Sequence, residues 1–388
     1  MALARLKSMR SVHQPAADSR SIAAGAAPSE AARILLSADR NLLCASVDWE
    51  RHEAVFGSAD HACYTVDLRR LKKARTLLGK TAGHREWVAA VCHLPGGRIA
   101  SGGLDASICV WPAAGAACQR IKGHAGPISQ LEPVPAAGAA AAFVSASYDK
   151  RLITWCCPGG SGGKARHQQV LAGHRAPVLQ LQVAGGCAAS GDRDGALLRW
   201  DLAAGAAVGG PLQAHTEHCT ALAWWHVGSS GGSADEISSR GNLLLSGGQD
   251  GCVRLWDFRA GRQVAQQAAH AGPAGKGAVG SMSAGPPSAP NLVVTAGADR
   301  AVRGLEARRN LEPVWSQELP DFPYSQARST SAVLLGCGDG TVVALEAADG
   351  SRRFALAASA SAVRTLHAGP TCFVAGCDDG SAMVYSLT

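Results

Sequence analysis

The stretch "SGGQDGCVRLWD" at residues 246–257 joins a run of small residues to the turn sequence Asp250-Gly251 and then to an alternating apolar run that ends in Trp256-Asp257. An Asp-Gly turn between two short runs with period-two alternation predicts a β-hairpin. A single hairpin buries too little apolar surface to be stable in water, so further strands must pack against it.

The hairpin sequence recurs along the chain. Four more copies share the small-residue run, the aspartate and the apolar run: "FGSADHACYTVD" from residue 56, "SGGLDASICVWP" from 101, "SASYDKRLITWC" from 145 and "SGDRDGALLRWD" from 190. Three fainter copies follow: "TAGADRAVRGLE" from residue 295, "LGCGDGTVVALE" from 335 and "AGCDDGSAMVYS" from 375. We call the aspartate in the fifth place of each copy the marker aspartate; the eight are Asp60, Asp105, Asp149, Asp194, Asp250, Asp299, Asp339 and Asp379. Their separations, from 40 residues (299 to 339) to 56 residues (194 to 250), indicate a solenoid or propeller rather than separate domains.

Each repeat has room for four strands. Two more short apolar runs lie between copies, for example "KARTLLGK" at residues 73–80 and "WVAAVCHL" at residues 87–94. A lone four-stranded sheet cannot bury both of its faces, whereas sheets stacked around an axis can, and this closure leaves only short strand edges. We therefore predict an all-β fold, a β-propeller of eight four-stranded blades, with a seven-bladed ring and one outlying copy as the alternative.

Two dipeptides point to a family. A Gly-His or Ala-His pair precedes several copies, and Trp-Asp ends two of them: Gly83-His84, Gly123-His124, Gly173-His174, Ala214-His215, Ala269-His270, Trp200-Asp201 and Trp256-Asp257. Over roughly residues 33–388 the chain resembles the WD-repeat β-propellers, and a match in so many copies is far more specific than a single motif. The resemblance implies a non-enzymatic scaffold that presents a rigid face to protein partners.

The resemblance also implies a buried polar set of one His, one Ser, the marker aspartate and one Trp in each of blades two to five. These sets are His84, Ser101, Asp105 and Trp111; His124, Ser145, Asp149 and Trp155; His174, Ser190, Asp194 and Trp200; and His215, Ser246, Asp250 and Trp256. A buried indole N–H needs an acceptor, Ser both accepts and donates, and His can link the Ser to the aspartate, so these residues are interpreted as structural. Blade six keeps His270, Thr295 and Asp299, whereas blades one, seven and eight lack both the His and the Trp and are expected to depend on apolar packing alone.

The propeller is predicted to span residues 33–388 as one domain, after a flexible N-terminal arm at residues 1–32. An organelle transit peptide is the alternative for the first 17 residues, which contain Arg and Ala but no acid. The sequence "RILLS" at residues 33–37 is expected to return to the last blade and complete it. The Gly- and Ser-rich segments 226–241 and 272–290 are expected to be loops on the face opposite the marker turns.

Composition and charge narrow the function. The formal net charge of +7 is small for 388 residues, and the basic run "RRLKKAR" at residues 69–75 is interpreted as a solvated edge rather than a nucleic-acid site, with a nuclear import signal as the alternative. The 13 cysteines are an odd number scattered through predicted strands, which is typical of small buried residues in a reducing compartment such as the cytoplasm or nucleus. The chain has no Cys-x-x-Cys pair and no apolar run approaching ~18 residues, so we expect neither a metal site nor contact with a membrane.

Catalytic motifs are present only in the wrong context. The segments "GGSGG" at residues 159–163 and "GSSGG" at residues 228–232 match Gly-x-Ser-x-Gly, but neither lies in a strand-to-helix turn. Gly163-Lys164 and Gly275-Lys276 lack both the first Gly and the following Ser or Thr of a phosphate-binding loop. We therefore predict no enzymatic activity, no cofactor and no small-molecule substrate.

The remaining candidate residues lie on the surface. In the WD-repeat family, the residue before the marker aspartate and the residues just after the His line the narrower face of the ring. Here these residues are Arg85, Glu86, Trp87, Tyr148, Arg175, Arg193, Glu217, His218 and Gln249. Trp, Tyr and Arg dominate the binding energy of protein interfaces, so we predict a site for other proteins of a multi-subunit complex. Packing of Trp87 into the interior at the start of an inner strand is the alternative for that residue.

Residues 244–259, "LLSGGQDGCVRLWDFR", support an alternative function. They resemble the sixteen-residue box of WD-repeat receptors in cullin-RING ubiquitin ligases, in which the Arg contacts the adaptor. The resemblance implies an adaptor contact at Trp256, Asp257 and Arg259, and hence a substrate receptor of such a ligase.

Overall fold

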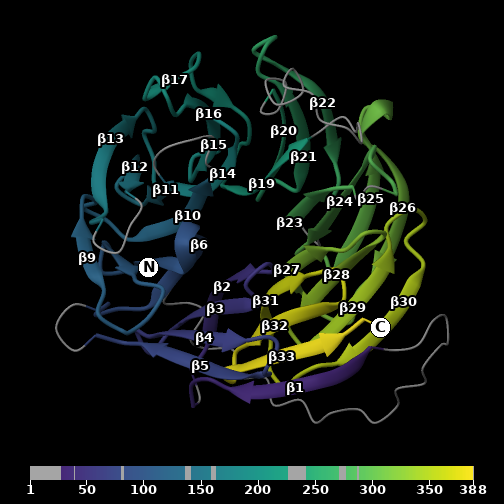
Figure 1. Ribbon diagram of the computed structural model, residues 1–388. Coiled ribbons are helices and arrows are strands. Elements are labelled where there is room, and N and C mark those ends of the chain that lie inside the picture. The colour runs from purple at the N-terminus through teal and green to yellow at the C-terminus, as the bar shows by residue number, and fades with distance from the viewer. Residues whose placement is uncertain are drawn as a thin grey trace.

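The computed structural model describes residues 28–38, 40–79, 83–135, 141–158, 163–225, 242–270, 277–285 and 288–387. Its strands form eight separate antiparallel sheets, the blades, which stand side by side as a ring (Figure 1). The inner strand of each blade packs against the inner strand of the next, and the last packs against the first, so the ring is closed. The predicted eight-bladed β-propeller is therefore confirmed, and the seven-bladed alternative is wrong.

The blades are numbered in chain order, and each is given from its inner to its outer strand. Blade one contains β2 (Leu42–Asp48), β3 (Glu53–Ser58), β4 (Cys63–Asp67) and β5 (Lys72–Leu77); blade two β6 (Val88–Leu94), β7 (Arg98–Gly103), β8 (Ser107–Trp111) and β9 (Gln119–Lys122). Blade three contains β10 (Ile128–Val134), β11 (Ala141–Ser147), β12 (Arg151–Cys157) and β13 (Arg166–Ala172); blade four β14 (Val178–Ala184), β15 (Cys187–Asp192), β16 (Ala196–Asp201), β17 (Ala206–Ala207) and β18 (Leu212–Gln213).

The second half of the ring follows the same scheme. Blade five contains β19 (Cys219–Trp225), β20 (Leu243–Gly248), β21 (Cys252–Asp257) and β22 (Arg262–Ala268); blade six β23 (Val279–Ala284), β24 (Leu292–Gly297), β25 (Ala301–Glu306) and β26 (Glu312–Glu318). Blade seven contains β27 (Pro323–Arg328), β28 (Ala332–Cys337), β29 (Thr341–Glu346) and β30 (Arg352–Ala357); blade eight β31 (Val363–Ala368), β32 (Cys372–Cys377), β33 (Ser381–Ser386) and β1 (Ser29–Leu35). Two short 3-10 turns, η2 (Pro95–Gly97) and η4 (Ala307–Arg309), lie between strands. Among the described residues no helix has the length and hydropathy to cross a membrane.

The two ends of the described chain meet in blade eight. The outer strand β1 pairs antiparallel with β33, with Arg33 opposite Met383 and Leu35 opposite Ser381, and the two strands lie together at the edge of that blade in Figure 1. The expected return of the segment from residue 33 to the last blade therefore occurs. The strand begins at Ser29, four residues before the predicted domain boundary at 33, because Ser29, Glu30 and Ala32 also pair with β33. Residues 1–27 of the predicted arm lie outside the described residues.

One predicted loop contains a strand. The Gly- and Ser-rich composition predicts a loop over residues 272–290, whereas residues 279–284 form β23, the inner strand of blade six. Val279 is fully buried there, and Ser281 Oγ–H donates to Gln326 Oε1 of the next inner strand over 2.9 Å. Small polar residues fit this strand because they pair across to the neighbouring blade, so it lacks the apolar alternation that reveals a strand in sequence. The other predicted loop, residues 226–241, lies outside the described residues.

The outer strand of blade four is interrupted. Its pieces β17 and β18 both pair with β16, and Gly209, Gly210 and Pro211 lie between them. Pro has no backbone N–H to donate to a strand ladder, and Gly209 has a positive φ of 79°, which breaks the extended conformation. The two short pieces together take the place of one fourth strand.

Hydrophobic clusters fill the gaps between neighbouring blades. Among the described residues each of the eight gaps has one cluster, built from the facing sides of two blades. Trp111 packs in the gap between blades one and two, whereas the gap between blades six and seven is filled by Trp315 of the outer strand β26. The Trp315 indole N–H donates to Ala347 O over 3.0 Å, and Gly304 makes room for the ring, since a Cβ there would lie 2.3 Å from it.

Candidate protein-interaction face

The marker aspartates shape the turns between the second and third strands of the blades. In every blade except four, the backbone N–H two residues after the marker donates to its carboxylate. This side-chain contact closes the turn and explains why an Asp heads it. We call the face of the ring that carries these turns the Asp-turn face.

The predicted polar set forms a hydrogen-bonded chain in blade two. The Trp111 indole N–H donates to Ser101 Oγ over 2.8 Å, and His84 joins Ser101 through Nε2 (2.8 Å) to Asp105 through Nδ1 (3.2 Å). Because a carboxylate only accepts, Nδ1 carries the hydrogen and Nε2 accepts from the Ser hydroxyl. The same contacts span 2.7–3.0 Å in blade three (His124, Ser145, Asp149, Trp155) and in blade five (His215, Ser246, Asp250, Trp256).

Blade six has a shorter chain. His270 lies 2.8 Å from Asp299 through Nδ1 and 3.0 Å from Thr295 Oγ1 through Nε2. Leu305 stands where the other blades have Trp, and it is fully buried, so packing replaces the indole hydrogen bond there.

Blade four uses a different aspartate from the predicted one. His174 Nδ1 lies 2.8 Å from Asp192 Oδ2, and Ser190 keeps its expected contacts with His174 and Trp200. Asp192 also accepts from two backbone N–H groups of the turn, at 3.0 and 2.9 Å, so it takes over both roles of the marker. Asp192 is buried and Asp194 is exposed, so the buried role predicted for Asp194 is wrong.

Hydroxyl groups replace the His in blades one and eight. The Ser37 hydroxyl and the Tyr64 O–H both donate to Asp60, the latter over 2.6 Å. In blade eight the Ser359 hydroxyl donates to Asp379 over 3.2 Å. The prediction that these two blades depend on apolar packing alone is therefore wrong, because a Ser at the His position reaches the same carboxylate.

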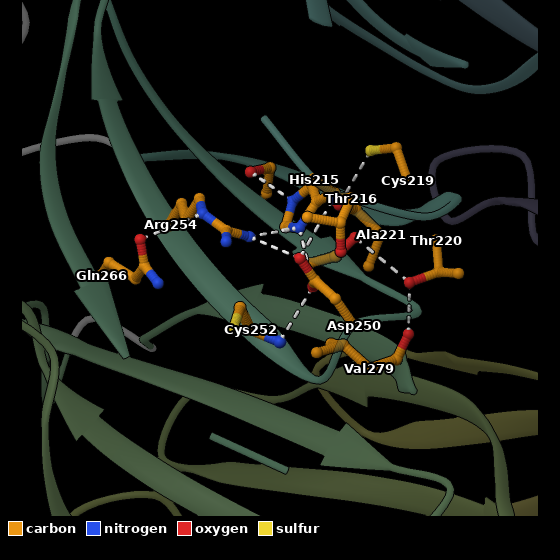
Figure 2. Close-up of polar contacts among 12 residues, drawn as sticks. His215, Thr216, Cys219, Thr220, Ala221, Asp250, Cys252, Arg254, Gln266 and Val279 are labelled. Carbon is orange, nitrogen blue, oxygen red and sulfur yellow. Dashed lines mark hydrogen bonds and ion pairs between the residues drawn. The ribbon is translucent and has the colours of Figure 1, made fainter. Parts of the chain in front are cut away.

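Arginines bind the marker aspartates from the third and fourth strands. Figure 2 shows Arg254 reaching Asp250 beside His215, with Arg254 Nη1 2.9 Å from Asp250 Oδ2. Equivalent pairs in other blades are Arg120 with Asp105, Arg151 with Asp149 and Arg303 with Asp299. These arginines were not predicted from the sequence, although Arg254 and Arg303 both follow their marker by four positions.

These contacts set the charge of the polar sets. Burial by itself raises the pKa of Asp250, but hydrogen bonds from His215, the Cys252 N–H and Arg254 outweigh it and hold the pKa well below its usual range. The same balance gives Asp299 a pKa of about 2. Burial lowers the pKa of His215. Blade five therefore holds an ionised aspartate beside a neutral His at neutral pH.

One backbone hydrogen bond recurs in each of the eight blades and brings two classes of surface residue together. The N–H of the residue before the marker position donates to the carbonyl of the residue before the inner strand, over 2.8–3.0 Å. In blade five these residues are Gln249 and His218, and in blade two they are Leu104 and Trp87. The residues predicted to bind partners therefore lie side by side on the Asp-turn face.

Most of the predicted partner-binding residues are open to solvent. Arg85, Glu86, Tyr148, Arg175, Arg193 and Glu217 are exposed, and Trp87, His218 and Gln249 are partly exposed. Trp87 thus keeps part of its surface in water and is not fully packed into the interior. The His218 Nδ1–H donates to Arg193 O over 2.5 Å, which joins the surfaces of blades four and five.

Comparison with known proteins agrees with this geometry. The family model described as "WD domain, G-beta repeat" matches residues 75–112 and 209–257, which include the three inner strands of blades two and five. The chain is a WD-repeat β-propeller. Among solved structures it is similar to Sqt1 of Saccharomyces cerevisiae, with a TM-score of 0.75 and 11% identity over 93% of this chain and 98% of that one. It is also similar to the computationally designed Ika8 protein, with a TM-score of 0.67 and 20% identity over 91% of this chain and 99% of that one.

At these identities the structural likeness shows the fold of the WD-repeat propeller and nothing more. A comparison with curated proteins found no match in sequence. Within the described residues, no group of three or more His, Cys, Asp or Glu side chains is arranged to hold a metal ion.

The propeller places the three residues of the predicted adaptor contact in different environments. Trp256 is buried and donates its indole N–H to Ser246 Oγ over 2.9 Å, so a direct contact of Trp256 with an adaptor is wrong. Asp257 is partly exposed and lies 3.5 Å from Arg259 Nε, and 67% of the Arg259 side chain is exposed. Arg259 lies between β21 and β22. Because strands alternate in direction, this turn is on the face opposite the Asp-turn face.

Proposed function

We propose that this propeller is a non-enzymatic scaffold of a multi-subunit complex and that it binds a protein partner through blades two to five of the Asp-turn face. One observation carries the proposal. In blades two to five the His, Ser and Trp side chains and the carboxylate that the His contacts are used inside the blades, that carboxylate being Asp192 in blade four. The exposed arginines, Tyr148 and Trp87 beside them keep surface in water. WD-repeat propellers in general mediate contacts between proteins. Exposed Arg, Tyr and Trp are the residue types that supply most of the energy of such contacts.

The charge of this surface favours a protein over a nucleic acid. Arg85, Arg175 and Arg193 are interspersed with Glu86 and Glu217. A phosphate backbone selects a surface of one sign, because binding depends on neutralising many phosphates at once. A mixed surface instead complements the mixed charges of another protein.

The buried cysteine thiols support a location in a reducing compartment, the cytoplasm or the nucleus. Burial raises the pKa of Cys63 and of Cys337 to about 12 in each case. Buried thiols with a raised pKa are inert small apolar residues. They need no disulfide partner to hold the fold.

Proximity labelling in cells, followed by mass spectrometry, tests the proposed surface. The labelled neighbours of the native chain are compared with those of Trp87→Ala and Arg193→Ala, and Val264→Ala on the outer strand β22 is the control because Val264 is also exposed. We expect the two face variants to lose the same neighbours by at least about fivefold, since one hot-spot residue contributes about 1–2 kcal/mol or more. Equal neighbour lists for all four proteins would place the binding site elsewhere.

The exposed guanidinium of Arg259 supports the alternative, a substrate receptor of a cullin-RING ubiquitin ligase. Asp257 holds Arg259 at the turn through its carboxylate, which accepts the Arg259 backbone N–H over 2.9 Å. Capture of the ligase adaptor by the native chain, loss of that capture in Arg259→Ala and its retention in Arg262→Ala would support this function. Absence of the adaptor from the native capture would exclude it.

A further inference from the structure

Blade seven is the place where the Asp-turn face departs from the rest of the ring. Leu319 occupies the His position there, since its N–H donates to Arg300 O (2.7 Å) as the His270 N–H donates to Gly251 O (2.9 Å). A buried Leu has no group to offer a carboxylate. Among the described residues, Asp339 therefore accepts only from its own turn, from the N–H and the hydroxyl of Thr341, and it is exposed.

Two aromatic side chains are exposed beside this carboxylate. Phe322 is 46% and Tyr324 is 41% exposed, although both belong to residue types that are normally covered. Phe322 immediately precedes the inner strand, and its carbonyl accepts the Gly338 N–H over 2.9 Å, directly before Asp339 in the chain. The two rings and the Asp339 carboxylate therefore share one corner of the Asp-turn face.

A second carboxylate covers the same turn. Asp321 Oδ2 would lie 2.7 Å from a Cβ at Gly338, and the Tyr324 ring would lie 3.1 Å from it. Glycine at 338 is what allows both side chains to pack over the turn. In the described part of the chain, neither Asp321 nor Asp339 has a basic side chain within 4.0 Å, and both accept only from their own loop or turn.

Blade eight fixes the tyrosine ring. Arg364 donates to both carboxylate oxygens of Asp378, at 2.8 and 3.0 Å, and its Cζ lies 4.2 Å from the centroid of the Tyr324 ring. A guanidinium held by a bidentate carboxylate is a rigid support for an aromatic face. Tyr324 is therefore held in place before any partner arrives, which lowers the entropy cost of binding.

We propose that Asp321, Phe322, Tyr324 and Asp339, supported by Arg364 and Asp378, bind a basic segment of a partner protein through a Lys or Arg side chain. The carboxylates of Asp321 and Asp339, which form no ion pair within the described residues, supply the complementary charge. The exposed rings cover the apolar stem of a long basic side chain. The same carboxylates repel phosphate, so the corner does not fit a nucleic acid. The site shares the Asp-turn face with the proposed function but lies on blades seven and eight.

A peptide array tests the site. The intact chain is applied to immobilised nonapeptides of mixed sequence whose central residue is fixed as Lys, Arg, Glu or Leu. We expect at least about a fivefold stronger signal from the Lys- and Arg-centred peptides than from the Glu-centred ones. The preference should disappear in the double variant Asp321→Asn/Asp339→Asn and weaken at least about fivefold in Phe322→Ala.

Matched variants make each outcome decisive. Asp349→Asn removes another exposed carboxylate of blade seven, on the opposite face, and should keep the full preference. No preference for basic peptides, or an equal response of Asp349→Asn and the double variant, would overturn the site. If Trp87→Ala abolishes the preference for basic peptides and the double variant keeps it, the site on blade seven is also overturned. That result would instead support binding at blades two to five. Loss in the double variant, with unchanged neighbours of Trp87→Ala in cells, would support this site and reject the other.

Discussion

Replacing Asp192 by Ala should destabilise the propeller, whereas replacing Asp194 by Ala should not. Asp192 accepts from His174 Nδ1 at 2.8 Å and from two backbone N–H groups at 3.0 and 2.9 Å. Its removal leaves a buried imidazole N–H without an acceptor, which costs about 2 kcal/mol, and loses two turn hydrogen bonds of about 0.5–1 kcal/mol each. The expected loss in the free energy of unfolding is about 3–4 kcal/mol.

Thermal unfolding followed by circular dichroism measures this loss. At roughly 2 cal/mol/K per residue the unfolding entropy of a chain of this length is about 0.8 kcal/mol/K, so Asp192→Ala should lower Tm by about 4–5 °C. Asp194→Ala removes an exposed carboxylate and should change the free energy of unfolding by no more than about 0.5 kcal/mol. Equal destabilisation by the two variants would refute the assignment of Asp192.

A double-mutant cycle separates the His174 contact from the turn contacts. Asp192→Ala and His174→Ala should be non-additive, with a coupling of about 1–2 kcal/mol, because they remove the same hydrogen bond. Asp194→Ala and His174→Ala should be additive. Coupling of His174 with residue 194 instead would contradict the structure.

Three further perturbations test other parts of the ring. Trp315→Ala should lower the free energy of unfolding in urea by about 3–5 kcal/mol because it leaves a cavity in the gap between blades six and seven. Val314→Ala, at a side chain that is 55% exposed, should leave the free energy of unfolding almost unchanged. Equal urea midpoints for the two variants would contradict this packing. Ile34→Ala should destabilise the closing strand β1 by about 2–3 kcal/mol, whereas Leu35→Ala, at a side chain that is 64% exposed, should not destabilise it. A larger loss of stability in Leu35→Ala than in Ile34→Ala would mean that β1 is out of register by one residue. Asp299 has a pKa of about 2 against an ordinary 3.8, so its ionised form stabilises the fold fully above about pH 4, and this stabilisation is lost as the pH falls toward 2. Between pH 5 and pH 2.5 the Tm of Asp299→Asn should therefore fall less than the Tm of the native chain. Parallel curves of Tm against pH would contradict the His270 and Arg303 contacts.

The repeat and its closure could be predicted because they depend on local chemistry. An Asp that heads the turn recurs in all eight copies, and a Gly-His or Ala-His pair precedes it in blades two to six. The polar sets of blades two, three and five follow from this pattern, since each needs only His84, Asp105 and their equivalents in the same register.

The assignment in blade four failed because two acids lie two positions apart. Alignment on the fifth place selects Asp194, but the side chain that faces the His belongs to position 192. The equivalent residues in blades two and five are Gly103 and Gly248, where a Cβ would lie 2.5 and 2.2 Å from the His Nδ1. An acid at a position that holds Gly, Ser or Cys in the other seven blades was the signal, and only the packing against His174 shows what it does.

Other misses arise where one chemical group replaces another. Ser37 and Ser359 donate to their marker aspartates as the His does elsewhere, although nothing near them in the sequence resembles Gly-His. The strand β23 is hidden because its partners, rather than an apolar pattern, hold it in place. The sequence shows that blade seven lacks the His, but only the structure places Leu319 at that position and exposes Phe322 and Tyr324 beside the turn.

Site-specific photo-cross-linking in cells tests the binding face most directly. A benzophenone amino acid is placed at residue 148 on the Asp-turn face and, in a second protein, at residue 264 on the outer strand β22, where the native Tyr148 and Val264 are 38% and 49% exposed. We expect discrete cross-linked protein species from position 148 and none from position 264. Cross-links that form at the outer strand and are missing from the turn face would contradict the role of that face.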